Sequence, residues 1–197
     1  MRKCSLSDAE IRPALKEELR LTHWAEPDTV LLEELGVNRG GVRADVALVN
    51  GIIHGYEIKS DRDSLRRLAT QVDLYGKCFD RATLVTGSRH LDAALALLPD
   101  WWGVMRVDAA RYGTHFTIVR WPSDNPGRDA RTLCELLWLD DAVALLKVHG
   151  IDRGVRGKTR EVVWDRMSKC LDIEIIASAV RANLKARARQ IGPRLQM

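Results

Sequence analysis

The sequence predicts an α/β protein with a mixed central β-sheet flanked by helices and followed by a helical C-terminal appendage. Through residues 7–120, short apolar runs at strand spacing alternate with runs at helical spacing. Residues 121–131 contain two prolines, a glycine and no apolar run, so they predict a linker or a long loop. We therefore expect a core over residues 1–125 and a basic helical region over residues 126–197.

The first elements are a helix and a β-hairpin. Residues 7–22 predict one amphipathic helix or two short ones, with Ser7 and Glu10 as a capping box. Residues 29–35 read as a helix or a strand. Residues 43–59 alternate in polarity on either side of an Asn-Gly pair, which is the strongest short-range signal for a hairpin.

The rest of the core continues the alternation of strands and helices. The spacing of apolar residues predicts a helix at 61–79, a buried strand at 81–86, a helix at 90–98, a strand at 102–107 and an edge strand at 116–120.

Beyond the linker the pattern is helical. Residues 133–150 predict a helix that is interrupted near Asp140 and ends at a glycine. A basic loop at 152–158 precedes a second helix at 159–170, and a third helix begins near Asp172.

The chemistry concentrates in the hairpin. Asp45 lies on its first strand, and Glu57 and Lys59 lie on its second strand, one residue apart and therefore on one face. Two carboxylates supply the hard oxygen ligands that Mg²⁺ prefers, and Mn²⁺ could replace it. A lysine ammonium can hold or deprotonate an attacking water, so the trio predicts hydrolysis of a phosphodiester bond.

The register of the hairpin decides whether this site can form. A strict two-residue turn would set Asp45 opposite Tyr56 and send Glu57 to the other face of the sheet. We therefore predict one extra residue, as a longer loop or as a bulge, and the isolated Gly55 is the expected place for a bulge.

Neighbouring segments offer supporting groups. Glu33 and Glu34 supply a third carboxylate upstream of the hairpin, and either could serve. Gln71 and Tyr75 are four residues apart on the predicted helix 61–79, so they project from one face as a wall that could orient a lysine or a phosphate.

These residues together resemble the PD-(D/E)XK nuclease superfamily, and the Gln-x-x-x-Tyr element resembles its RecB-like branch. The chain also resembles a family of small bacterial proteins within that superfamily, over about residues 5–150 and most specifically over residues 30–105. The resemblance implies a restriction-endonuclease-like core and DNA as the substrate. It also implies roles for particular groups: Asp45, Glu57 and the backbone carbonyl of Ile58 as metal ligands, Lys59 as the catalytic lysine, Gln71 and Tyr75 as supporting catalytic residues, and Glu34, on a helix, as an outer ligand. One departure is that Ala44 precedes Asp45, where the motif has proline.

Positive charge gathers near the C-terminus. Residues 131–197 carry 13 Lys and Arg against eight Asp and Glu, whereas the net charge of residues 1–130 is −1. Residues 144–167 resemble a SAP-type DNA-binding module, and a plain helical hairpin packed on the core is the alternative. The residues expected to meet phosphates are Arg153, Arg156, Lys158 and Arg160 in this stretch, and Arg181, Lys185 and Arg189 on the last helix, where a solvated terminal helix is the alternative.

Composition excludes several other classes. No run of eighteen apolar residues and no apolar leader is present, so we expect neither a membrane span nor export. The four cysteines form no C-x-x-C pair, which argues against a zinc site and suits the cytoplasm. No glycine-rich phosphate loop supports ATP or NAD dependence, and the five histidines show no metal-ligand spacing.

The sequence thus predicts a cytoplasmic, Mg²⁺-dependent nuclease that acts on DNA in preference to RNA, from a bacterium or a phage. A homodimer is an open alternative to a monomer. The competing interpretation is a nucleic-acid-binding protein, or a partner-dependent defence or repair component, whose nuclease fold cleaves nothing by itself.

Overall fold

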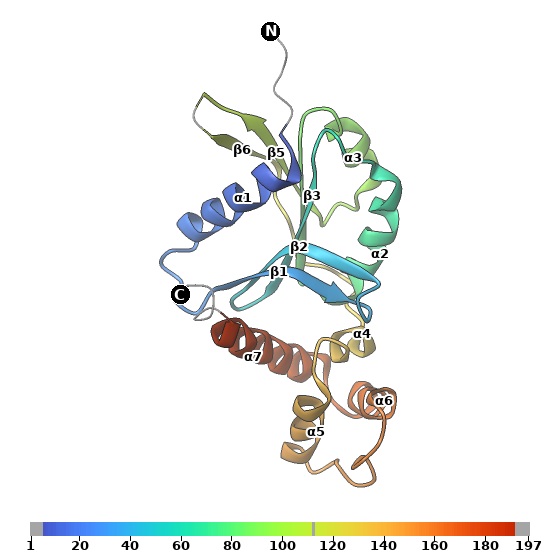
Figure 1. Cartoon of the computed structure of the whole chain (residues 1–197). Coiled ribbons are helices and arrows are strands. Elements are labelled where there is room, and N and C mark those ends of the chain that lie inside the picture. The colour runs from blue at the N-terminus through green and yellow to red at the C-terminus, as the bar shows by residue number, and fades with distance from the viewer. Residues whose placement is uncertain (1–5, 112, 192–197) are drawn as a thin grey trace.

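A computed structural model describes residues 6–111 and 113–191 of the chain. It has a six-stranded mixed sheet with helices on both faces and further helices after the last strand (Figure 1). The described elements, in chain order, are α1 (Asp8–Thr22), β1 (Val30–Val37), β2 (Val42–Val49), β3 (Ile53–Lys59), a 3₁₀ turn η1 (Leu65–Arg67), α2 (Leu68–Cys78), β4 (Arg81–Thr86), α3 (Leu91–Leu97), β5 (Gly103–Ala109), β6 (Thr114–Arg120), α4 (Ala130–Cys134), α5 (Leu139–Val148), α6 (Arg160–Cys170) and α7 (Ile173–Ile191). The predicted α/β class, with a mixed sheet and C-terminal helices, is confirmed.

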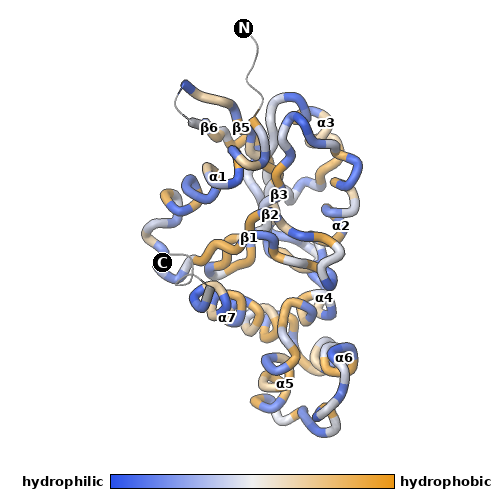
Figure 2. The backbone as a smooth tube through the Cα atoms, viewed as in Figure 1, coloured by the Kyte–Doolittle hydropathy of each residue, from blue (hydrophilic) through white to orange (hydrophobic). Residues whose placement is uncertain are grey.

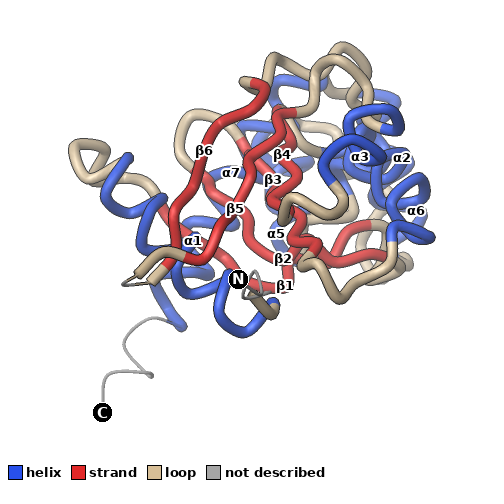
Figure 3. The backbone as a smooth tube through the Cα atoms, turned by 90° about the horizontal axis from the view of Figure 1, so that it is seen from above, coloured by secondary structure: helices blue, strands red, loops and turns tan. Residues whose placement is uncertain are grey.

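The strands lie in the sheet in the same order as in the chain, β1 to β6 (Figure 3). The first three strands are antiparallel neighbours, β3, β4 and β5 run parallel, and β6 returns antiparallel along β5. Parallel strands need a connection that returns the chain to the starting end of the sheet. The segment with α2 makes this connection between β3 and β4, and the segment with α3 makes it between β4 and β5. β3 is therefore a central strand, and all seven of its residues are buried.

The hairpin between β2 and β3 has the extra residue that the sequence argument required. Val49 pairs with Ile53, so three residues form the loop instead of two. This register continues to Val46 opposite Tyr56, and one step further it sets Asp45 opposite Glu57. The prediction of a longer loop is confirmed.

Two details of the hairpin prediction are wrong. Neither Asn50 nor Gly51 has the positive φ of a type I′ turn. No bulge occurs at Gly55 either, because the pairing runs unbroken through Ala47 and Gly55. Gly55 is needed for another reason: a Cβ at this position would lie 2.7 Å from the ring of Phe79, so only glycine lets that ring pack on the strand.

Two apolar clusters hold the sheet between its helices. On one face α1 contributes Ile11, Leu15 and Leu19, which pack with Val46, Leu48 and other residues of the sheet. The capping box of Ser7 and Glu10 fixes the start of this helix as predicted, and Pro13 lies inside the helix without ending it.

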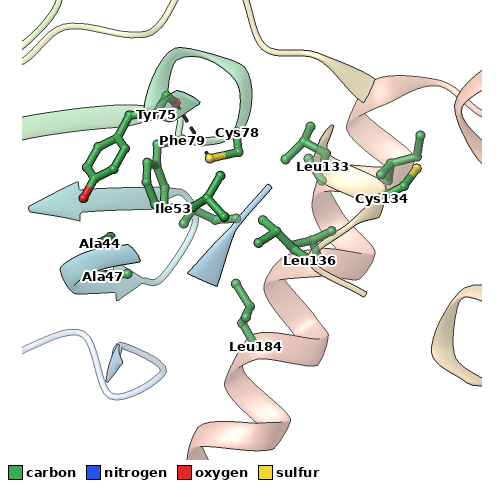
Figure 4. Close-up of a cluster of buried hydrophobic side chains, with 14 of the residues drawn as sticks. Ala44, Ala47, Ile53, Tyr75, Cys78, Phe79, Leu133, Cys134, Leu136 and Leu184 are labelled. Carbon is green, nitrogen blue, oxygen red and sulfur yellow. Dashed lines mark hydrogen bonds between the residues drawn. The ribbon is translucent and has the colours of Figure 1, made fainter. Parts of the chain in front are cut away.

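The other face carries the larger cluster, and the C-terminal helices belong to it. Figure 2 shows apolar residues along β1, β2 and the side of α7 that meets them. In Figure 4, Leu133 of α4, Leu136 of the α4–α5 connection and Leu184 of α7 belong to the same cluster as Ile53 of the sheet and Phe79. One apolar cluster contains residues from both sides of position 125. The division of the chain into two domains at that position stays a prediction.

Other boundaries differ locally from the prediction. The predicted helix 61–79 starts later, with the 3₁₀ turn at Leu65, because Ser60 and Asp63 close a separate turn before it. The predicted helix 133–150 is two helices, α4 and α5, and the interruption predicted near Asp140 lies just before it, at residues 135–138. Among the described residues, no helix combines the length and the apolar character needed to span a membrane.

Candidate active site

Glu57 and Lys59 project from β3 toward α2 and are among the few charged residues that the fold buries. Their relative exposures are 2% and 4%, and the Lys59 ammonium donates to Oε1 of Glu57. Burying two charges costs solvation free energy, which their attraction offsets only where further hydrogen bonds complete the pair. The surroundings of Glu57 supply those bonds.

Gln71 and Tyr75 of α2 both donate to Glu57. Nε2 of Gln71 lies 2.5 Å from Oε1, and the Tyr75 hydroxyl lies 2.6 Å from Oε2. The two residues reach one carboxylate because they are one helical turn apart. Burial and the negative charge of Glu57 hold the pKa of Tyr75 well above its usual range, so the phenol is neutral and can donate. The structure thus brings four of the predicted residues together.

Asp45 completes the cluster from the neighbouring strand. Its Oδ2 accepts from the backbone N–H of Ile58 at 2.7 Å, and its Oδ1 accepts from Arg12 at 2.8 Å. Burial, helped by the negative charge of Glu57, raises the pKa of Asp45 to about 6, although Ile58 and Arg12 act in the opposite direction. The contact with Asp45 involves the N–H of Ile58 and not its carbonyl, so the role of that carbonyl as a ligand stays a prediction.

Arg12 was missed by the sequence argument. This α1 residue donates to Glu34 at 2.7 Å, to the Asp45 carbonyl at 2.9 Å and to Asp8 at 3.1 Å, in addition to the Asp45 carboxylate. The spacing of Asp8 and Arg12 by four residues was the available signal. It showed an ion pair on the helix, but not that the packing of α1 would turn this pair toward β2.

The glutamate doublet lies on a strand and not on a helix, which corrects the prediction. Glu33 and Glu34 belong to β1, where Glu33 pairs with Lys16 and the register sets Glu34 opposite Asp45. Glu34 has a φ of 52°, a left-handed conformation that is uncommon for a residue with a side chain. Of the two, Glu34 lines the same cavity as Asp45 and Glu57.

That cavity has a volume of about 610 Å³ and opens between α1, the β1–β2 turn and α2. Both signs of charge line it: Asp8, Glu34, Asp45, Glu57 and Asp63 against Arg12, Arg43, Lys59 and Arg67. A pocket with this mixture can receive a phosphate on its cations and a divalent cation on its carboxylates.

The oxygen donors of the cavity can be compared with what Mg²⁺ requires. Within residues 6–111 and 113–191, no three His, Cys, Asp or Glu side chains group as a metal site would. Asp45 and Glu57 nevertheless are two hard donors on adjacent strands, and the buried Oε1 of Gln71 beside them has no hydrogen-bond partner. Because Mg²⁺ commonly takes one or two carboxylates and fills its other positions with water and phosphate, this donor set is compatible with it.

The predicted phosphate-contacting residues fall into two groups. The first four are exposed at the loop before α6 and at its first turn: Arg153, Arg156, Lys158 and Arg160. On α7, Lys185 and Arg189 both pair with Asp28, and Arg181 is half-buried. The positive charge of Lys185 and Arg189 on α7 is therefore partly neutralised by Asp28. The sequence alone could not associate Asp28 with these two residues.

A protein-family model described as bacteriophage P4 protein cII matches residues 1–192. The chain belongs to this family. One member, Protein cII of Enterobacteria phage P4, is 29% identical over 115 residues, which is 58% of this chain and 43% of that protein. The chain thus matches less than half of the length of that cII protein, and no solved structure matches it. The cII names state no activity, so the likeness to the nuclease superfamily stays a prediction.

Proposed function

We propose that this chain is a metal-dependent nuclease of the PD-(D/E)XK type, with a restriction-endonuclease-like core, that hydrolyses phosphodiester bonds in DNA. The strongest support is the convergence of Asp45, Glu57 and Lys59 at one cavity, with Gln71 and Tyr75 both donating to Glu57. The longer hairpin loop also supports it, because only that register lets the two carboxylates share a site.

In this proposal Asp45 and Glu57 hold Mg²⁺, with the Ile58 carbonyl and Glu34 as further oxygen donors. The bound ion would stabilise charge on the phosphate and lower the pKa of a water molecule. The donor set and the unpartnered Oε1 of Gln71 support this assignment, since all of these groups are oxygen ligands.

Lys59 and its neighbours supply the rest of the chemistry. The ammonium of Lys59 positions the attacking water and stabilises negative charge as the bond breaks. Gln71 and Tyr75 hold the Glu57 carboxylate, so its oxygens keep one orientation while substrate binds. The basic residues of the C-terminal region contact DNA phosphates without reading sequence.

A second candidate is a nucleic-acid-binding protein that cleaves nothing without a partner. The observation that favours it is that Lys59 and Arg12 already neutralise the two carboxylates. In both cases we place the protein in the cytoplasm, where the free Cys78 and Cys134 would stay reduced.

The test compares cleavage by the wild type with that of Glu57→Gln and Lys59→Met, which keep the size of each side chain. Supercoiled, linear and single-stranded DNA and RNA are incubated with Mg²⁺ or Mn²⁺. Lys77→Met on the same helix as Gln71 is the matched control, because Lys77 is partly exposed, pairs with Asp73 of its own helix and does not line the cavity. We expect cleavage by the wild type and the control alone. Equal traces from all four proteins, with circular dichroism showing them folded, would leave the binding-only candidate.

A further inference from the structure

Two arginines that line the candidate active-site cavity have no partner among residues 6–111 and 113–191. Arg43 lies on β2 and Arg67 lies at the N-terminal end of α2, and both residues are exposed. No hydrogen bond, ion pair or ring contact joins either guanidinium to a described residue. We call these two residues the free arginines, and their N–H groups are open to an anion that enters the cavity.

The charged groups around the free arginines are already partnered. Arg12 pairs with three of the carboxylates that line the cavity, and Lys59 pairs with Glu57. Asp63, the fifth acid of the lining, accepts from the backbone N–H and from the hydroxyl of Ser60. An anion can therefore bind the free arginines without first separating them from a carboxylate.

Arg43 continues the row of site residues on β2. It lies two residues from Asp45, which is the spacing that sets two side chains on one face of a strand. The Tyr75 hydroxyl that donates to Glu57 also lies 3.2 Å from the carbonyl oxygen of Arg43. The backbone of Arg43 is therefore held against the same group that orients the Glu57 carboxylate.

Arg67 continues the row of site residues on α2. It is the N-cap residue and precedes Gln71 by four positions, so both project from the side of the helix that faces Glu57. The first turn of α2 also places Thr70 in the wall of the cavity, and its hydroxyl has no partner in the part of the chain that the structure describes. The positive end of the helix dipole adds to the attraction for an anion here.

The depth of each cation determines which phosphate it can meet. Lys59 and Glu57 are buried at the floor of the cavity, where the proposed function puts the phosphate that is cut. Arg43 and Arg67 are exposed and stand on two different walls, β2 and α2, nearer the mouth. A strand that reaches the floor must pass these walls, so the free arginines meet the phosphates next to the one that is cut.

We infer that Arg43 and Arg67 bind backbone phosphates adjacent to the scissile one, and that the site therefore acts on polynucleotide strands in preference to isolated phosphodiesters. A guanidinium is always charged and can donate two parallel N–H groups to phosphate oxygens. Such contacts position a strand and carry no sequence information. The inference rests on the proposed function for the place of the scissile phosphate.

The first test measures binding without cleavage. A fluorescent single-stranded oligothymidylate is titrated with protein by anisotropy, without divalent cation and at several salt concentrations. Arg43→Met and Arg67→Met should each lower the slope of log affinity against log salt concentration by about 0.7, the change expected for one lost phosphate contact on a single strand. Arg43→Lys and Arg67→Lys keep the charge and should restore most of the slope.

Arg66→Met is the matched control, because Arg66 is the exposed neighbour of Arg67 and does not line the cavity. We expect the slope of this variant to equal that of the wild type. Unchanged slopes in both cavity variants overturn the inference. An equal decrease in the control overturns it as well, because the effect would then come from general surface charge.

The second test compares two substrates in the presence of Mg²⁺: the same oligonucleotide and bis-p-nitrophenyl phosphate, which has a single phosphate. Arg43→Met and Arg67→Met should each raise KM for the oligonucleotide by about tenfold or more, as loss of a hydrogen bond to a charged group does. Their cleavage of the isolated diester should equal that of the wild type. Equal loss with both substrates would put the arginines at the scissile phosphate and overturn the inference. Lower salt slopes without cleavage by the wild type would support the phosphate contacts and reject the nuclease.

Discussion

Replacing Lys59 with methionine should destabilise the protein strongly at pH 7 and only weakly at pH 5. The substitution removes a buried cation and leaves Glu57, which is 2% exposed, with two neutral donors. Breaking a buried ion pair by removing one partner typically costs about 3 to 5 kcal/mol. The carboxylate can avoid part of this cost by taking up a proton.

The cost of that proton sets the expected magnitude. For an ordinary carboxyl with a pKa of about 4.3, protonation at pH 7 costs about 3.7 kcal/mol, and at pH 5 it costs about 1 kcal/mol. The loss of stability in Lys59→Met should therefore be about 3 to 4 kcal/mol at pH 7 and fall to about 1 kcal/mol at pH 5.

The assay is urea denaturation of the wild type and of Lys59→Met at both pH values, with the free energy of unfolding extrapolated to water. The double variant Glu57→Gln with Lys59→Met is the control, since it removes both charges and should lose little stability at either pH. A loss that is the same at pH 5 and pH 7 would refute the reasoning, because it would mean that the missing charge is not what destabilises the single variant.

Three further results are expected. Gly55→Ala should cost about 1 to 3 kcal/mol of stability, because the new methyl group would press on the ring of Phe79, and an unchanged melting temperature would contradict that packing. Tyr75→Phe should cost about 1.5 to 3 kcal/mol, because it removes a 2.6 Å hydrogen bond to the charged Glu57; a stability equal to that of the wild type would mean the bond is not formed. Folding raises the pKa of Asp45 from 3.8 to about 6. Protonation of Asp45 therefore stabilises the folded state fully below pH 3.8, and this stabilisation is lost as the pH rises through about 6. Asp45→Asn should flatten this part of the stability profile in urea titrations between pH 4 and pH 7, and an identical slope would count against the shift.

The local elements and the composition of the site were predictable because they depend on short-range patterns. The capping box at Ser7, the strand at 81–86 and the separation of Glu57 from Lys59 by one residue follow from neighbours in the chain. The need for an extra hairpin residue also followed from the two-residue period of strands. Its location did not, because the period of the strands is restored equally by an extra residue in the loop or at Gly55. The glycine at position 55 is instead required by Phe79, a residue distant in the chain whose ring packs on the strand.

Long-range packing also explains what was missed at the site. Arg12 reaches Asp45 because α1 lies across the sheet, and no pattern within residues 7–22 states which strand that helix will face. The assignment of Glu34 to a helix failed for a related reason. Pairing with β2 decided the conformation of a short segment that its own residues left open.

The guanidinium of Arg12 has a consequence for any divalent ion that approaches this pocket. It ties α1 to Asp45 and Glu34, while Lys59 occupies Glu57, so the carboxylates are already partnered before an ion arrives. Metal coordination must therefore displace Arg12 or Lys59 from a carboxylate. The measured metal affinity will be the difference between the attraction of that carboxylate for the metal and its attraction for the side chain. The same exchange would loosen the hold on the N-terminal helix, so ion uptake and the position of that helix should be thermodynamically linked.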